Sequence, residues 1–134
     1  MKNHAAIVLH DGDKILFIKR AATKKSLPNI WAFPSGTMED GETIKETAIR
    51  EAREELGVDV IIEREIGSVE LPELESILHF VICKKSYGDI IFNEGEIQKI
   101  RWMTFDEFFN EYSDDQIGHG LIYLRKNPQI WQSI

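Results

Sequence analysis

Three glutamates near the middle of the chain have a spacing suited to binding a metal ion. Glu51, Glu54 and Glu55 stand at i, i+3 and i+4, so a helix through this stretch would place the three carboxylates on one face. Oxygen-only ligands are typical of sites for hard ions such as Mg²⁺ or Mn²⁺. The pattern therefore predicts a divalent-metal site. The simpler alternative is an acidic helix face that is exposed to water.

Signals at both ends predict the helix that would carry these carboxylates. Thr43 and Glu46 have the spacing of a capping box, and Gly57 is placed as the left-handed residue that ends a helix. An apolar stripe at helical spacing is formed by Ile44, Ala48, Ala52 and Leu56. We therefore expect a helix over residues 43–56 that packs one face on the core and presents the acidic face to a site.

The same stretch resembles the signature box of the Nudix hydrolases. Gly36, Glu42 and the run Arg50-Glu51-Ala52-Arg53-Glu54-Glu55-Leu56-Gly57-Val58 fill every specified position of that motif. The resemblance implies an α/β fold, an αβα sandwich with a mixed β-sheet, and Mg²⁺-dependent cleavage of phosphoanhydride bonds, with Mn²⁺ as a substitute. It also implies that the three glutamates ligate the metal and that an ion pair between Glu42 and Arg50 orients them, which places Arg50 among the catalytic residues.

Two residues outside the box complete the site that the resemblance implies. Ser35 stands where the family usually has a glycine whose carbonyl oxygen can ligate the metal, and serine supplies the same carbonyl. A positive φ at this position would cost serine about 1 kcal/mol. Glu96 precedes Trp102 at a spacing that matches an acidic loop residue, a further ligand or the general base in similar proteins, with Glu94 as the reserve. Whether Glu54 or Glu96 is the general base stays open.

Substrate contacts are expected from segments on both sides of the box. Arg20 ends a predicted strand, and its counterpart contacts substrate in similar Nudix enzymes. Trp31 and Phe33 alternate on a short strand and would suit an aromatic wall for a nucleobase, although core packing is the simpler role for at least one of them. Asp114 and Asp115 resemble the base-reading aspartates of oxidised-purine nucleotide hydrolases, with an ordinary helix cap as the alternative.

The four histidines show no metal-ligand spacing and are expected to be packed or on the surface. They are His4, His10, His79 and His119. Because it follows the two aspartates, His119 is a minor candidate for contact with the substrate.

The remaining pattern predicts strands and helices in alternation. Strands are expected at residues 3–10, 14–20, 31–33, 59–69 and 76–84. Thr104 is expected to cap a short helix, and a final amphipathic helix is expected from about residue 117 to residue 126. With 134 residues, the chain fits one domain over residues 1–134.

Composition limits the partners and the compartment. The net charge of −7 argues against a long polyanion such as duplex DNA as the partner. The single cysteine, Cys83, excludes an intramolecular disulfide and suits a reducing cytoplasm. The N-terminal apolar run is too short for a signal peptide or a membrane span. We therefore expect a cytoplasmic protein that binds a small nucleotide and neither nucleic acid polymer nor membrane, while the oligomeric state stays open.

The leading functional hypothesis is Mg²⁺-dependent hydrolysis of a nucleoside diphosphate derivative. The first choice is a nucleoside triphosphate, including one with an oxidised purine, split into monophosphate and pyrophosphate. An ADP-ribose or other nucleotide-sugar pyrophosphatase is the first alternative, and the compact length of the chain argues against it. A nucleotide-binding sensor without turnover is the second alternative, and the complete set of carboxylates in the box argues against it.

Overall fold

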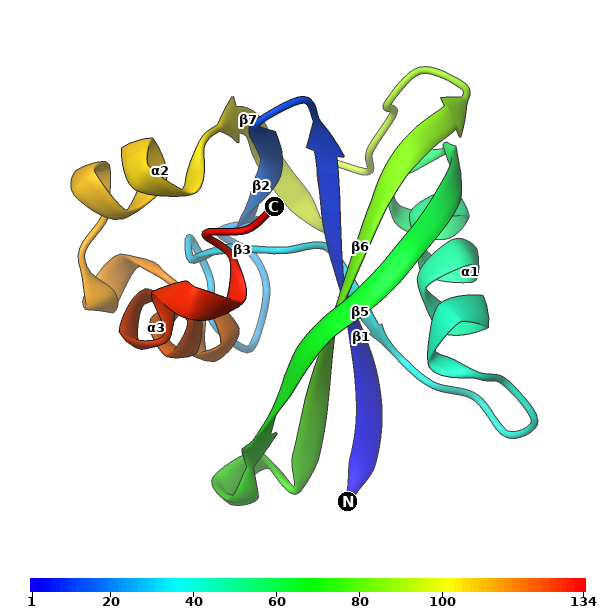
Figure 1. Ribbon diagram of the computed structural model, residues 1–134, viewed down its shortest axis with the longest axis horizontal. Helices are drawn as coiled ribbons and strands as arrows, with labels where there is room; N and C mark the ends of the chain where they lie inside the picture. The colour runs from blue at the N-terminus through cyan, green and yellow to red at the C-terminus, as the bar shows by residue number, and fades with distance from the viewer.

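A mixed β-sheet of seven strands forms the centre of the molecule (Figure 1). Five strands follow the order β3-β2-β1-β6-β5. Of the other two, β4 pairs with β1 and β7 pairs with β2. The computed structural model describes residues 1–134. The strands are β1 (Lys2–Asp11), β2 (Lys14–Arg20), β3 (Trp31–Ala32), β4 (Ser35–Thr37), β5 (Asp59–Leu71), β6 (Ser76–Tyr87) and β7 (Ile97–Met103). β1 runs parallel to β6 over most of its length but pairs with β2 only beside the hairpin turn. The sheet therefore opens into two arms, β4-β1-β6-β5 and β3-β2-β7.

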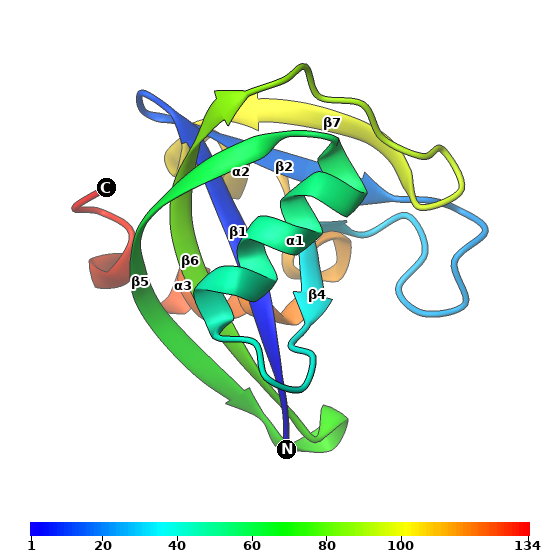
Figure 2. The same cartoon turned by 90° about the vertical axis from the view of Figure 1, so that its right-hand side faces the viewer.

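Helices cover both faces of this sheet (Figures 1 and 2), with α1 (Ile44–Leu56) on one side and α2 (Phe105–Glu111) and α3 (His119–Lys126) on the other. Three short 3₁₀ helices are η1 (Pro72–Leu74), η2 (Asp114–Gln116) and η3 (Pro128–Ile130). Successive residues of β1 alternate between two cores: Ile7 packs on the α1 side and Val8 on the α2 and α3 side. The expected αβα sandwich is confirmed.

Helix α1 forms as the end signals predict. The Thr43 hydroxyl accepts a hydrogen bond from the Glu46 N–H, the Glu46 carboxylate accepts one from the Thr43 N–H, and Gly57 has φ = 68°. Ala48 and Ala52 are fully buried, so the helix backbone lies close to the sheet. The face that carries Glu51, Glu54 and Glu55 is thereby turned away from the core centre and towards β4 and β7.

Two strands, β4 and β7, were not expected from the sequence. β4 pairs antiparallel with β1 (Ala6 with Ser35), and β7 pairs antiparallel with β2. The last helix begins two residues later than expected, because Ile117 bridges to Trp31 in parallel pairing and stays extended. None of the helices is both long and apolar enough to cross a membrane.

Candidate active site

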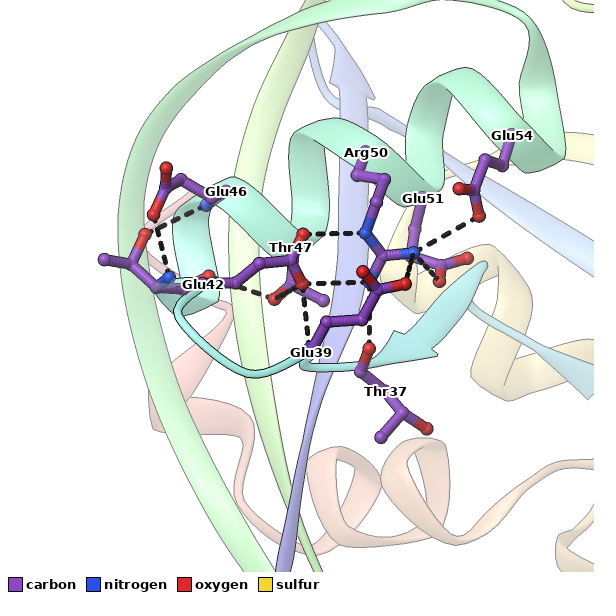
Figure 3. A network of polar contacts seen from close by, with 9 residues as sticks. Thr37, Glu39, Glu42, Glu46, Thr47, Arg50, Glu51 and Glu54 are labelled. Atoms are coloured by element: carbon purple, nitrogen blue, oxygen red, sulfur yellow. Dashed lines mark hydrogen bonds and ion pairs between the residues drawn. The ribbon is translucent and has the colours of Figure 1, made fainter.

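Arg50 is the centre of a polar network on the exposed face of α1 (Figure 3). Its Nε and Nη2 donate to the two oxygens of Glu42 at 2.7 and 2.9 Å, and Nη1 donates to Glu51 at 2.8 Å and to Glu54 at 3.2 Å. Nη2 also donates to the Thr37 carbonyl at 2.9 Å. The expected Glu42–Arg50 ion pair is present and bidentate, which is the strong geometry for an arginine and a carboxylate. One guanidinium thus fixes three carboxylates and the end of β4.

Glu42 is held by several donors, and its protonation state follows from them. The pKa of Glu42 is lowered to about 2, mainly by the hydrogen bonds from Arg50 and to a smaller extent by the one from the Glu39 N–H. The Thr47 hydroxyl adds a third donor at 3.0 Å. Glu42 is therefore a permanent anion at neutral pH, and it holds Arg50 in place.

Gly36 in β4 leaves room for a close approach of Glu51. A Cβ atom at Gly36 would lie 1.9 Å from the Glu51 Cδ, so a larger residue there would displace this carboxylate from its observed position. Burial raises the pKa of Glu51. Ser35 has an ordinary negative φ, so its substitution for glycine carries none of the strain considered above.

Glu55 is the half-buried carboxylate of the site. Burial, followed by the charge of Glu51, raises the pKa of Glu55 to about 8, while a hydrogen bond from the Ser35 backbone works in the opposite direction. It lines a small cavity together with Ser35, Glu96 and Arg20, and no basic side chain forms an ion pair with it. A half-buried carboxylate beside further carboxylates is a poor arrangement without a cation.

The donor chemistry of this region fits Mg²⁺. Glu51, Glu54, Glu55 and the Ser35 carbonyl offer only oxygen atoms, which is the ligand type that Mg²⁺ and Mn²⁺ prefer. As the side chains stand, no three of the acidic, histidine or cysteine residues converge on one point, because Glu51 and Glu54 both turn to Arg50. The three glutamates lie on α1 and Ser35 lies on the neighbouring β4, and their assignment as ligands stays a prediction.

Glu96 is tied to the loop that follows β2. Its carboxylate forms an ion pair with Lys24, which lowers the pKa of Glu96, and its carbonyl accepts a hydrogen bond from the Ala21 N–H at 3.0 Å. Glu96 lines the cavity beside Glu55, whereas Glu94 does not. Of the two acidic residues considered before Trp102, Glu96 is thus the one placed at the carboxylate cluster.

Arg20 lies between the carboxylate cavity and a second cavity. Its guanidinium donates to the carbonyls of Ser26 at 3.0 Å and Leu27 at 3.2 Å, and so shapes the loop of residues 21–29. Both cavities are lined by Arg20, Phe33 and Ser35. The expected position of Arg20 beside the site is therefore observed, although its donors are partly used inside the chain.

The second cavity has a volume of about 140 Å³ and a mainly apolar wall. Its wall includes Leu27, Ala32, Leu71, Leu78 and Leu121, with His119 at its edge. These residues come from β3, β5, β6, α3 and the loop after β2. Nothing in the sequence pattern relates them, so this cavity was missed.

The expected aromatic wall is different in the structure. Trp31 is only 3% exposed and packs against Phe108 and Tyr112, so it has no ring face free for a nucleobase. Phe33 is also buried and packs against Phe17, but it contributes to the wall of both cavities. Core packing is therefore the role observed for Trp31, because α2 covers this face of the strand.

The two aspartates considered for base recognition do not line either cavity. Asp114 forms an ion pair with Arg125, and Asp115 accepts a hydrogen bond from the Ser113 hydroxyl. They begin η2, where Ser113 and Gln116 form a capping box. The aspartates therefore lie in the first turn of a short helix that Ser113 caps, and the polar side chain of this region that lines the cavity is His119.

Comparison with known proteins agrees with this architecture. The NUDIX domain family model matches residues 2–123. The chain is 29% identical over 100 residues to the NAD-capped RNA hydrolase NudC of Pseudomonas aeruginosa, covering 75% of this chain and 35% of that protein. It is 29% identical over 98 residues to a putative 8-oxo-dGTP diphosphatase of Bacillus subtilis, covering 73% of this chain and 62% of that protein.

Solved structures show the same fold. A NUDIX hydrolase from Nitrosomonas europaea superposes with a TM-score of 0.75 at 17% identity, covering 98% of this chain and 88% of that one. The chain spans about a third of the length of the Pseudomonas aeruginosa relative and somewhat less than two thirds of the length of the Bacillus subtilis relative. With the family model matching nearly the whole sequence and the complete box over residues 36–58, the chain belongs to the Nudix family.

Proposed function

We propose that this protein is an Mg²⁺-dependent hydrolase that cleaves a phosphoanhydride bond in a nucleoside diphosphate derivative. The first substrate class is a nucleoside triphosphate, split into monophosphate and pyrophosphate. The observation that carries the proposal is the adjacency of two cavities: one lined by Glu55 and Glu96, the other mainly apolar, with Arg20 and Ser35 on both. A polyphosphate at the carboxylates would place an attached nucleoside in the apolar cavity.

The residues divide the work of hydrolysis between them. Glu51, Glu54, Glu55 and the Ser35 carbonyl would hold Mg²⁺, which supplies neutralisation of charge on the phosphoryl oxygens. A water attacks phosphorus, the anhydride P–O bond breaks, and the water proton passes to a carboxylate, Glu54 or Glu96. Arg50 keeps the carboxylates of α1 in position, and Arg20, which lines both cavities, would meet the phosphates.

The names of the two relatives support different substrates. The Bacillus subtilis relative is called a putative 8-oxo-dGTP diphosphatase, which favours a triphosphate. The Pseudomonas aeruginosa relative is called an NAD-capped RNA hydrolase, which makes a pyrophosphate inside a dinucleotide cap the second candidate. Both contain the bond that the carboxylate cluster is suited to cleave. The acidic net charge and the small cavity favour the free nucleotide over the polymer.

A substrate screen tests the proposal. The purified chain is incubated with Mg²⁺ or Mn²⁺ and nucleoside triphosphates, oxidised purine triphosphates, ADP-ribose, dinucleoside polyphosphates and NAD-capped RNA, and the products are identified by ³¹P NMR. We expect release of pyrophosphate and monophosphate from at least one triphosphate, and loss of that release with EDTA. Metal-dependent binding of a non-hydrolysable nucleotide without turnover of any substrate would instead identify a sensor.

A further inference from the structure

We propose that His119 is a specificity-determining residue that contacts the nucleobase in the apolar cavity. This inference rests on the proposed function and concerns the part of the substrate that is remote from the reacting phosphates. It assigns base recognition to a residue at the start of α3, which lines the cavity, in place of the neighbouring Asp114 and Asp115, which do not.

The first observation is that His119 differs from the other histidines of the chain. His4, His10 and His79 each use both ring nitrogens in hydrogen bonds to neighbouring residues. The His119 ring forms no hydrogen bond or ion pair within the chain. A neutral imidazole offers one donor and one acceptor. Because His119 is exposed, both can be reached by a ligand that enters the cavity.

The second observation is that the backbone around His119 is fixed. The Gly118 N–H donates to the Trp31 carbonyl at 2.9 Å, and Ile117 bridges to the same residue. On the other side, a Cβ atom at Gly120 would lie 2.6 Å from the Leu78 Cδ2, so the first turn of α3 packs directly against the cavity wall. A residue held in this way is suited to discriminating between ligands, because little ordering is required on binding.

The third observation is the distribution of polar side chains along the wall. Arg20 and Ser35 also line the carboxylate cavity, so they lie at the end where the phosphates are expected. Apart from these two residues, His119 is the polar side chain on an otherwise apolar or glycine wall. An apolar pocket discriminates weakly between bases of similar shape, whereas a hydrogen bond that only one base can make adds discrimination on the scale of one hydrogen bond. Selectivity among bases should therefore depend on His119.

The experiment compares kcat and KM for the four common nucleoside triphosphates and an oxidised purine triphosphate in wild type and variants. In His119→Ala we expect KM for the best substrate to rise about tenfold, the scale of one lost hydrogen bond to the ligand, with kcat within about twofold of wild type. The ratio of kcat/KM between the best and the worst base should fall by a similar factor. His119→Gln, which keeps a donor and an acceptor, should recover part of the ratio.

Two controls separate this role from a structural one. The ratio of kcat/KM between the best and the worst base should be unchanged in Asp115→Asn and in His10→Ala, because neither residue lines the cavity. An unchanged ratio in His119→Ala, or a ratio that changes equally in Asp115→Asn, would overturn the inference while leaving the proposed function intact. Absence of triphosphate hydrolysis by the wild type would overturn the inference together with the first substrate class of the proposed function.

Discussion

The polar network around Arg50 and the apolar cavity beside it are built in opposite ways. The partners of Arg50 all lie between Thr37 and Glu54, within one turn-and-helix segment, and its carboxylates are held by several donors. The cavity wall comes from strands, a loop and a helix that are far apart in the sequence, and it contains an imidazole without a partner. The machinery for cleaving phosphate is thus local, whereas the pocket for the rest of the substrate depends on the whole fold.

This difference separates two kinds of functional constraint. A substitution in the Arg50 network should change the rate for every substrate, because all substrates share the phosphates. A substitution in the cavity wall should change which substrate is preferred. Variants in the two regions test this division.

The largest effect is expected from Glu54→Gln. Its side chain is 58% exposed, so the change should leave the thermal midpoint of unfolding nearly unchanged. We expect kcat to fall at least about 10²-fold for all substrates, the scale of a positioned catalytic group. Steady-state kinetics with two different triphosphates checks this, with Arg53→Gln on the same helix as control. A loss confined to one base would contradict the division.

Arg50→Lys should lower activity by about 10- to 100-fold, the range seen when a residue that orients metal ligands is changed. Lysine cannot donate to both oxygens of Glu42 while also reaching Glu51 and Glu54. We also expect a lower thermal midpoint, since the partly buried carboxylates lose their donor. Calorimetry and kinetics on the same preparation measure both effects. Retention of wild-type kcat would remove Arg50 from its proposed role.

Ala32→Leu should affect the other region alone. Ala32 lines the apolar cavity, and its methyl group lies near Gly118, so a larger side chain occupies space that a nucleoside would need. We expect KM to rise about five- to tenfold with kcat nearly constant, the pattern for lost uniform binding. Ala22→Leu, at an exposed alanine in the loop after β2, is the matched control. A fall in kcat with constant KM would show that the two regions are not separable.

Lys24→Met should give a smaller effect, about two- to fivefold in kcat. Lys24 is only 26% exposed in a loop whose other lysine, Lys25, is exposed, and its ion pair holds Glu96 at the edge of the carboxylate cavity. Ion pairs near the surface contribute little, which limits the expected loss. Lys25→Met, which has no contact with Glu96, should behave as wild type. Equal effects of the two changes would point to general electrostatic attraction of the substrate.

The smallest effect concerns acid stability. The pKa of Glu42 is lowered in the folded state from 4.5 to about 2, so this carboxylate stabilises the fold above pH 4.5 and loses that contribution as the pH falls towards 2. Glu42→Gln should therefore be less stable than wild type at neutral pH and should lose less stability between pH 4.5 and 2. Urea titrations at a series of pH values measure the free energy of unfolding of both proteins. Parallel pH profiles for wild type and Glu42→Gln would show that Glu42 is not the source of the acid-dependent loss of stability.

The sequence determines the local region far better than the assembled one. Helix α1, its Thr43 cap and its end at Gly57 depend on contacts a few residues apart, and each was predicted from the residues. The Glu42–Arg50 pair also lies within this segment, and it was expected from the resemblance to the Nudix box. The three-residue strand β4 was not, because a segment of this length has no period of its own and forms only through pairing with β1.

Two residues considered for substrate contact are engaged by distant partners. Trp31 was considered for an aromatic wall, with core packing as the alternative, and Phe108 and Tyr112, more than seventy residues later, cover it. Asp114 was considered for base recognition, but Arg125 of α3 takes its carboxylate. A pattern in one segment gives no information on which later segment will cover it, and this explains why the cavity was missed.

β1 pairs with segments that are synthesised at very different times. Its longest pairing, over residues 2–9, is with β6, which is made more than seventy residues later, whereas β4 pairs with residues 4–6 much earlier. Loop closure on the scale of the β6 pairing is slow compared with hairpin or helix formation. Before β6 is made, β4 and α1 can cover only part of the apolar stretch of residues 5–9, which makes the open edge of β1 the place where a nascent chain would most need a chaperone.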